Sequence, residues 1–227
     1  MNEMEALFAE WKKLVMNEAD HFVEDGIIYP EMWSQARKKI LFILKETNDY
    51  KGSISKLIHD ASTIRPKSGL WGSPTFHNIG RWAYGLLNYP QSVGAYKAAN
   101  NNRKKSVLSC SFINLKKTTG GRTATKTVDE SAQKYSKFIR RQIEIIDPEI
   151  IVFGGTFQIV KDNVIPELAR VSTRIHQFGS IICINANHPA CTKKRTLIYD
   201  QVVLNYHKYI SEKENSEGSA SASLTKI

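Results

Sequence analysis

The chain has 227 residues, of which 41% are hydrophobic and 24% are charged, so it can form one substantial core and is ordinary in composition for a globular protein. Its formal net charge of +10 favours a polyanionic partner, nucleic acid first and a membrane surface second, although such a charge also serves solubility alone. No apolar run approaches the length of a membrane span, which argues against an integral membrane protein.

The three cysteines, Cys110, Cys183 and Cys191, form no CxxC pair, so neither a zinc finger nor a four-cysteine iron–sulfur site is expected. An odd number of cysteines without a pattern suits a reducing cytoplasm. The start of the chain is acidic at Glu3 and Glu5, which does not fit a signal peptide. We therefore expect a cytoplasmic, monomeric protein with no metal or organic cofactor.

Apolar periodicity predicts most of the secondary structure. An amphipathic helix opens the chain at residues 4–15. Strands are then predicted at residues 39–44, 107–115, 150–153 and 181–184, and helices around residues 33–36 and at 79–87, 135–146, 157–168 and 197–209. The polar segment 88–105, and residues 100–105 above all, is expected to be a loop.

Short, continuously apolar strands that alternate with helices are typical of a buried parallel sheet covered on both faces. We therefore predict an α/β fold, a three-layer α/β/α sandwich around a four-stranded, mainly parallel sheet. A single domain is expected over residues 1–210. Residues 211–227 are low in complexity and are expected to form a disordered tail.

Two of the predicted strands run directly into polar loops. The strand at residues 39–44 is followed by Lys45 and Glu46, and the last strand is followed by His188 and Pro189. Because ligands of open α/β sheets bind at the carboxyl ends of the strands, these two loops are the first candidates for a functional site.

Five sequence features occur in one order along the chain. They are a strand that ends in Glu46, an aromatic segment at residues 69–76, a strand at 111–117, a segment at 146–155 that ends in two glycines, and the His-Pro loop at 187–190. In this order, and over about residues 38 to 208, the chain resembles the uracil-DNA glycosylase superfamily. The resemblance implies a monofunctional DNA glycosylase that acts on a base flipped out of DNA.

The resemblance implies two catalytic residues. Glu46 would stabilise positive charge on the sugar and position the attacking water. His188 would donate a hydrogen bond to the base oxygen and stabilise the leaving anion. By its sequence context alone, Glu46 could instead cap a helix or pair with Lys45, and His188 could bond the backbone of its own loop.

The resemblance also implies how base and backbone are held. Asn114 would read the Watson–Crick edge of the base, Trp71 or Phe76 would stack on it, and Asn48 would assist. Asn114 and Asn48 could equally form turns, and the two aromatic residues could be core. Six basic residues are expected to contact DNA phosphates: Lys116, Lys117, Arg122, Lys193, Lys194 and Arg195.

The loop that carries Glu46 lacks the glycine and the proline found in the family. The base is therefore open between uracil and a modified pyrimidine, including a modified phage cytosine removed in defence. A catalytically silent DNA-binding module of the same fold is the alternative. A nucleotide-processing enzyme that acts on small substrates would need a glycine-rich phosphate loop after the first strand, which the chain does not have there.

Overall fold

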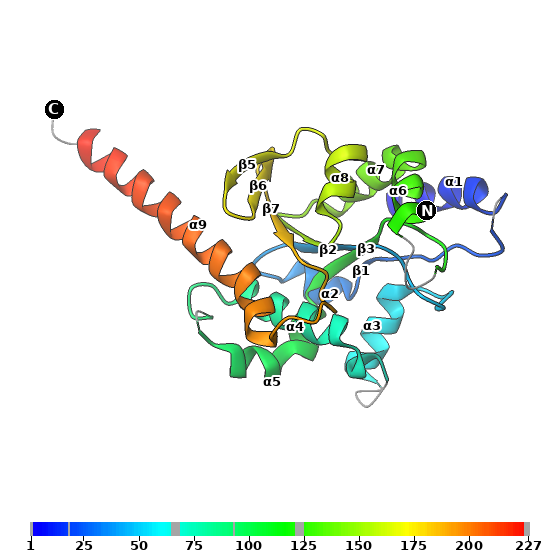
Figure 1. The fold of residues 1–227 in the computed structure, drawn as a ribbon, viewed down its shortest axis with the longest axis horizontal. Helices are drawn as coiled ribbons and strands as arrows, with labels where there is room; N and C mark the ends of the chain where they lie inside the picture. The colour runs from blue at the N-terminus through cyan, green and yellow to red at the C-terminus, as the bar shows by residue number, and fades with distance from the viewer. Residues whose placement is uncertain (1, 18, 65–68, 93, 121–124, 225–227) are drawn as a thin grey trace.

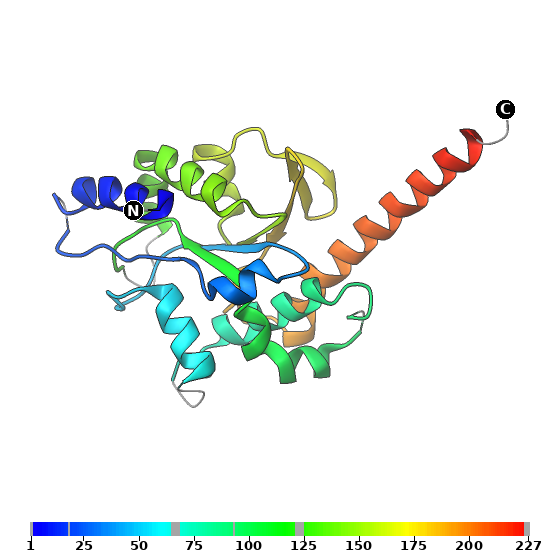
Figure 2. The same cartoon turned by 180° about the vertical axis from the view of Figure 1, so that it is seen from behind.

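The structure is a computed structural model that describes residues 2–17, 19–64, 69–92, 94–120 and 125–224, with side chains described as far as residue 216. Within these residues the chain forms an α/β fold around one mixed sheet of seven strands. Helices lie on both faces of this sheet, and α9 extends away from it (Figures 1 and 2).

The sheet has a parallel centre and antiparallel edges. Its strands are β1 (Gly26–Ile27), β2 (Ile40–Leu44), β3 (Cys110–Asn114), β4 (Ile150–Gly154), β5 (Ala169–Ser172), β6 (Ile175–Phe178) and β7 (Ile181–Ala186). They are ordered β1-β3-β2-β4-β7-β6-β5. The strands β3, β2, β4 and β7 are mutually parallel, whereas β1, β6 and β5 pair in antiparallel fashion.

The prediction of a four-stranded sheet is therefore wrong in the number of strands, because the sheet has seven. The four predicted strands are the parallel centre, where every residue of β2, β3 and β4 is buried. The three additional strands are short, and β5 is largely exposed, so they have no continuous apolar run by which the sequence could reveal them.

The helices α1 to α9 are defined by the following bounds. They are α1 (Glu3–Val15), α2 (Pro30–Ser34), α3 (Ile54–Thr63), α4 (Pro74–Leu87), α5 (Tyr96–Val107), α6 (Thr125–Lys134), α7 (Ser136–Ile146), α8 (Phe157–Asn163) and α9 (Arg195–Leu224), with a 3-10 turn at Gly69–Gly72. The prediction of a loop at residues 88–105 is wrong, because residues 96–105 belong to α5. Its polar character reflects a surface helix that buries little beyond Ala99, Ser106 and Val107.

Alternate side chains of the central strands pack into two separate cores. Leu41 and Ile43 of β2 face α1, α6, α7 and α8. Phe42 and its neighbours on the opposite face of β2 pack against α3, α4, α5 and α9. This alternation across a strand explains why continuously apolar strands are needed when both faces of a sheet are covered.

The last helix is longer than the sequence predicts. Its inner part packs against α4 through buried residues such as Val202 and Val203, and the rest projects from the domain (Figure 1, orange to red). Of the segment 211–227, expected to be a disordered tail, residues 211–224 are helical in the structure, and residues 225–227 lie outside the described residues. An i,i+4 pair of Lys208 with Glu212 and a hydrogen bond from the Tyr89 hydroxyl to Glu214 support the extension. In the described part of the chain, no helix is long and apolar enough to cross a membrane.

We predict that Gly85→Ala destabilises the fold. A Cβ at this position in α4 would collide with Val203 and crowd the Tyr199 hydroxyl of α9. Overpacking of this kind costs about 1–3 kcal/mol, more than the roughly 1 kcal/mol that alanine gains over glycine inside a helix. Urea unfolding of Gly85→Ala, Val203→Ala and the double variant checks this: the double variant should lose less stability than the two single losses summed. Strict additivity would contradict the proposed contact.

Candidate functional site

A cavity of about 270 Å³ lies where β2 and β3 end, next to the loop that follows β7. It brings together five of the side chains for which the sequence implied a role in catalysis or base binding. These are Glu46, Asn48, Phe76, Asn114 and His188. Residues far apart in the sequence thus meet at the carboxyl edge of the parallel strands, as expected for an open α/β sheet.

Asn114 is the last residue of β3 and lies at the wall of this cavity. The residue is only 2% exposed, and its Nδ2 atom has no hydrogen-bond partner among the residues that the structure describes. Its backbone N–H donates to Asp25 Oδ2 at 2.8 Å, which fixes the strand end. An unsatisfied buried donor costs about 1–3 kcal/mol, so this amide is ready to donate to a ligand in the cavity.

His188 lines the cavity from the loop after β7. Its Nδ1 atom accepts the backbone N–H of Ala190 at 3.2 Å, so in the neutral imidazole the proton is on Nε2. Burial, and then the positive charge of Lys45, lower the pKa of His188 below its ordinary value of 6.5. The imidazole is therefore neutral near pH 7 and has one N–H to donate.

Two glycines allow the His-Pro loop to approach the sheet. A Cβ at Gly155, which has a φ of +76°, would lie 3.0 Å from the Cβ of His188, and one at Gly154 would collide with Leu44. The other side of the loop is held by Asn78, whose Nδ2 donates to the Pro189 carbonyl at 2.6 Å. The position of His188 therefore depends on contacts from both β4 and α4.

Glu46 is held by an ion pair. Its side chain is 6% exposed and accepts a hydrogen bond from Lys116 Nζ at 2.9 Å. The same ammonium also donates to the carbonyl of Thr119 at 2.9 Å. A Cβ at Gly120 would collide with the carboxylate, so a larger residue there would displace the end of the Glu46 side chain. Glu46 does not pair with Lys45, whose Nζ donates to Thr125 Oγ1 at 2.9 Å.

Only one of the two aromatic candidates lines the cavity. Phe76 does so and is stacked on Phe112, with ring centroids 6.1 Å apart and an interplanar angle of 22°. Trp71 is a core residue instead: it is 6% exposed, and its Nε1 donates to the carbonyl of Ala61 at 3.2 Å. The implied stacking role of Trp71 is therefore not supported by its position.

Phe112 and Tyr50 also line the cavity, and the sequence reasoning missed both. Phe112 lies two residues before Asn114 in β3. Because side chains two residues apart in a strand share a face, this spacing could have revealed it. Tyr50 is exposed and follows the Glu46 loop, and no signal in the sequence distinguished it from an ordinary loop residue.

The implied phosphate contacts separate into different groups. Lys193, Lys194 and Arg195 are exposed around the start of α9 and are available to a partner. Lys116 is committed to Glu46, as described above. Arg122 lies outside the described residues.

Lys117 does not contact a partner at the surface, and its implied role in binding phosphates is wrong. Its side chain is completely buried and pairs with the buried Asp25 at 2.5 Å. Gln142 Nε2 donates to the same Asp25 oxygen at 2.8 Å, and the Lys117 ammonium lies 5.0 Å from the ring centroid of Trp11. Burial lowers the pKa of Lys117, and Asp25 opposes this shift. Since Asp25 also binds the backbone of Asn114, this network supports the cavity from behind.

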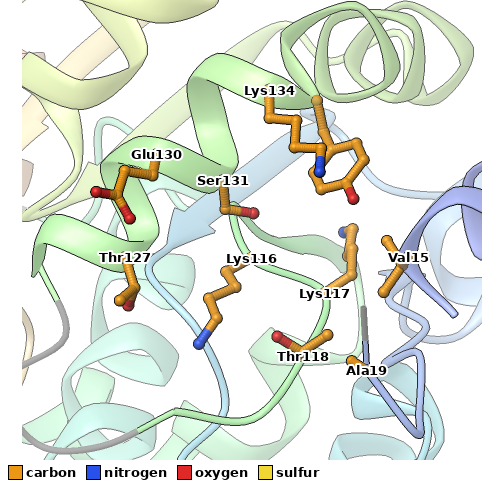
Figure 3. Close-up of a pocket in the computed structure, with 10 residues that line it drawn as sticks. Val15, Ala19, Lys116, Lys117, Thr118, Thr127, Glu130, Ser131 and Lys134 are labelled. Carbon is orange, nitrogen blue, oxygen red and sulfur yellow. The ribbon is translucent and has the colours of Figure 1, made fainter. Parts of the chain in front are cut away.

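A second cavity, of about 360 Å³, lies beside this network. It is lined by residues of α1, α6 and the segment after β3, and Figure 3 shows Lys116 and Lys117 pointing in different directions at its edge. Lys116, which lines this cavity, donates a hydrogen bond to Glu46 of the first cavity. Both lysines line this second cavity, and their ammonium groups pair with different carboxylates, those of Glu46 and Asp25.

No protein-family model matches the chain, and no curated protein matches its sequence significantly. Among the residues that the structure describes, no group of three His, Cys, Asp or Glu side chains is placed to hold a metal ion. The cavity at the ends of β2 and β3 thus offers an amide donor, a neutral imidazole, a carboxylate and an aromatic wall.

We predict that Lys45→Met raises the pKa of His188 without restoring 6.5, because burial is the larger cause of the shift. Histidine-detected NMR titration measures this, with Lys208→Met as the control for loss of a distant exposed charge. Because the folded-state pKa lies below 6.5, acid favours the unfolded state. The contribution of His188 to stability is thus present above pH 6.5 and is lost as the pH falls through its folded-state value. A wild-type pKa at or above 6.5 would contradict the proposed neutral donor.

We predict that Asp25→Asn lowers the free energy of unfolding by about 3–5 kcal/mol, because it leaves the Lys117 ammonium buried without a counter-charge. The double variant Asp25→Asn/Lys117→Met removes the charge and should recover part of this loss. Denaturant unfolding compares the two variants. Equal losses would show that the ion pair is not what stabilises this part of the core.

Proposed function

We propose that the chain is a monofunctional DNA glycosylase of the uracil-DNA glycosylase type, with the three-layer architecture of that superfamily. Its substrate would be a uracil or modified pyrimidine flipped out of DNA. The observation that carries the proposal is the buried, unpartnered amide of Asn114, which meets a carboxylate and a neutral imidazole in one cavity. Base excision requires these three kinds of group: a reader, a sugar-cation stabiliser and a donor to the leaving base.

In the proposed reaction the extruded base enters the cavity beside Phe76 and receives a hydrogen bond from Asn114. The bond between C1′ and the base nitrogen breaks, and its electron pair leaves with the base. His188 Nε2–H donates to the base oxygen that gains negative charge. The Glu46 carboxylate stabilises the cationic sugar and orients a water, which adds to C1′ and releases its proton to the carboxylate.

The cavity supports a pyrimidine with a substituent as well as uracil. Its volume of about 270 Å³ is more than an unsubstituted pyrimidine ring fills, and Asn48 and Tyr50 are exposed at its wall. A modified cytosine of phage DNA, removed in defence, is therefore within the proposed range of substrates. The exposed basic residues Lys193, Lys194 and Arg195 supply charge for the DNA backbone.

One observation favours the second candidate, a catalytically silent DNA-binding module. The Glu46 carboxylate already pairs with Lys116, and an ammonium at 2.9 Å reduces the negative charge available to a sugar cation. Such a module would keep the cavity and the basic loop but would not break the glycosidic bond.

We predict that the protein makes abasic sites in at least one duplex that contains uracil, hydroxymethylcytosine or glucosylated hydroxymethylcytosine, and leaves intact a duplex that contains the purine hypoxanthine. Single-turnover assays with alkaline cleavage measure the rate. Because each group acts in the transition state, Glu46→Gln and His188→Ala should lose on the order of 10²–10⁴-fold, and Asn114→Ala should also weaken binding of the flipped base.

Lys208→Gln, which removes one exposed charge from α9, is the control and should retain the wild-type rate. Cleavage without alkali would indicate a lyase rather than a hydrolase. Absence of excision on all the pyrimidine duplexes, or equal rates for Glu46→Gln and wild type, would refute the enzyme and leave the binding module.

A further inference from the structure

A third cavity, of about 290 Å³, lies on the other side of the His-Pro loop from the candidate site. Its wall consists of the first half of α4 and of residues 190–195, which lead into α9. Several of its lining side chains are basic or are hydrogen-bond donors: His77, Asn78, Arg81, Lys193 and Arg195. No acidic residue among those that the structure describes lines it, so its lining is more uniformly positive than that of the two other cavities.

Arg81 is the central group of this cavity. It is 3% exposed, and its partners are neutral amide oxygens rather than carboxylates. Nε and Nη2 donate to Asn100 Oδ1 at 3.0 and 2.6 Å, and Nη1 donates to Asn78 Oδ1 at 2.8 Å. Burial lowers the pKa of Arg81; Tyr96 opposes this, and the charges of Arg103 and Arg195 add to it. A buried guanidinium without a counter-charge is costly, so this position favours an anion.

His77 adds an unused polar atom to the same wall. Its Nδ1 is buried and has no hydrogen-bond partner within the described part of the chain. Burial, and then the charge of Arg103, lower the pKa of His77. A backbone hydrogen bond with Trp71 opposes this shift, and Arg81 and Arg195 add smaller contributions to it. The cations whose fields reach this imidazole thus come from α4, α5 and the start of α9. An anion bound among them would reverse this effect and raise the pKa of His77.

The cavity is joined to the candidate site through the His-Pro loop. Arg81 binds Asn78, and Asn78 donates to the Pro189 carbonyl, one residue after the His188 that lines the candidate site. Ala190 and Cys191 of the same loop line the basic cavity. A group bound in one cavity is therefore separated from a group in the other only by this short segment.

We propose that the basic cavity is a phosphate subsite, which holds a backbone phosphodiester of the DNA strand beside the flipped nucleotide. The inference rests on the proposed function for the identity of its ligand, a nucleic acid, while the anion preference follows from the charges alone. The N–H groups of Arg81 that remain after its bonds to Asn100 and Asn78, together with two neighbouring cations, are suited to phosphate oxygens. By fixing the backbone next to the extruded base, the subsite would offset part of the cost of flipping.

The first test follows His77 by NMR in the wild-type protein. Titration with inorganic phosphate, and separately with a duplex that carries an uncleavable abasic-site analogue, should raise the pKa of His77 in both cases. Arg195→Gln, which replaces an exposed residue at the start of α9, should reduce the rise in the pKa of His77 with either ligand. If neither ligand moves His77, the subsite is refuted. If phosphate moves it and DNA does not, the cavity binds an adventitious ion only, and the proposed DNA contact is refuted.

The second test measures how DNA affinity depends on salt. Loss of one phosphate contact should reduce the slope of log K against log salt concentration by about one in Arg195→Gln. Lys208→Gln removes the same charge from an exposed position further along α9 and should leave the slope unchanged. Equal slopes in the two variants would contradict the subsite.

The phosphate subsite and the proposed glycosylase activity can be refuted independently. If no duplex is cut but DNA still raises the pKa of His77 and Arg195→Gln still reduces the salt slope, the phosphate subsite stands and the glycosylase proposal fails. If a base is excised while Arg195→Gln behaves as Lys208→Gln does, the enzyme stands and the subsite fails.

Discussion

Parallel pairing of β2 with β3 aligns Leu44 with Asn114, and this register determines where the polar groups of the cavity meet. The pairing continues past the strand ends, where Leu115 and Lys116 donate to the carbonyls of Leu44 and Lys45. The ammonium of Lys116 is thereby brought beside Glu46. A shift of the register by one residue would turn Asn114 to the opposite face of the sheet, so the amide and the carboxylate share a cavity only in this alignment.

The wall of the cavity that carries His188 depends on the close approach of the His-Pro loop to the end of β4, not on strand register. Gly154 and Gly155 end β4 and leave room for the His-Pro loop, whose far side is fixed by Asn78. The same loop then separates the candidate base site from the basic cavity. His188 on one side and Arg81 on the other are thus linked through the Asn78 side chain and the Pro189 carbonyl, the connection on which the proposed joint binding of a base and its neighbouring phosphate depends.

The placement of charge is as specific as the placement of the backbone. Lys116 and Lys117 are adjacent in sequence, yet one stabilises the carboxylate of the cavity and the other is buried in an ion pair with Asp25. Asp25 also holds the backbone of Asn114. The basic net charge of the chain therefore does not translate directly into a binding surface, because part of it supports the interior of the site.

Periodicity alone determined the four buried strands and the helices α1, α4, α7, α8 and α9 in part, because continuous apolar runs and helical spacing are local properties of the chain. It did not indicate α3, α5 or α6. The two strand-end loops with Glu46 and His188 were also apparent from local sequence. Only the tertiary structure decided that Trp71 is core, that Lys117 is buried and that residues 96–107 form a helix. These outcomes depend on contacts between residues far apart in the sequence, such as the ion pair of Lys117 with Asp25. No local sequence pattern indicates such a contact.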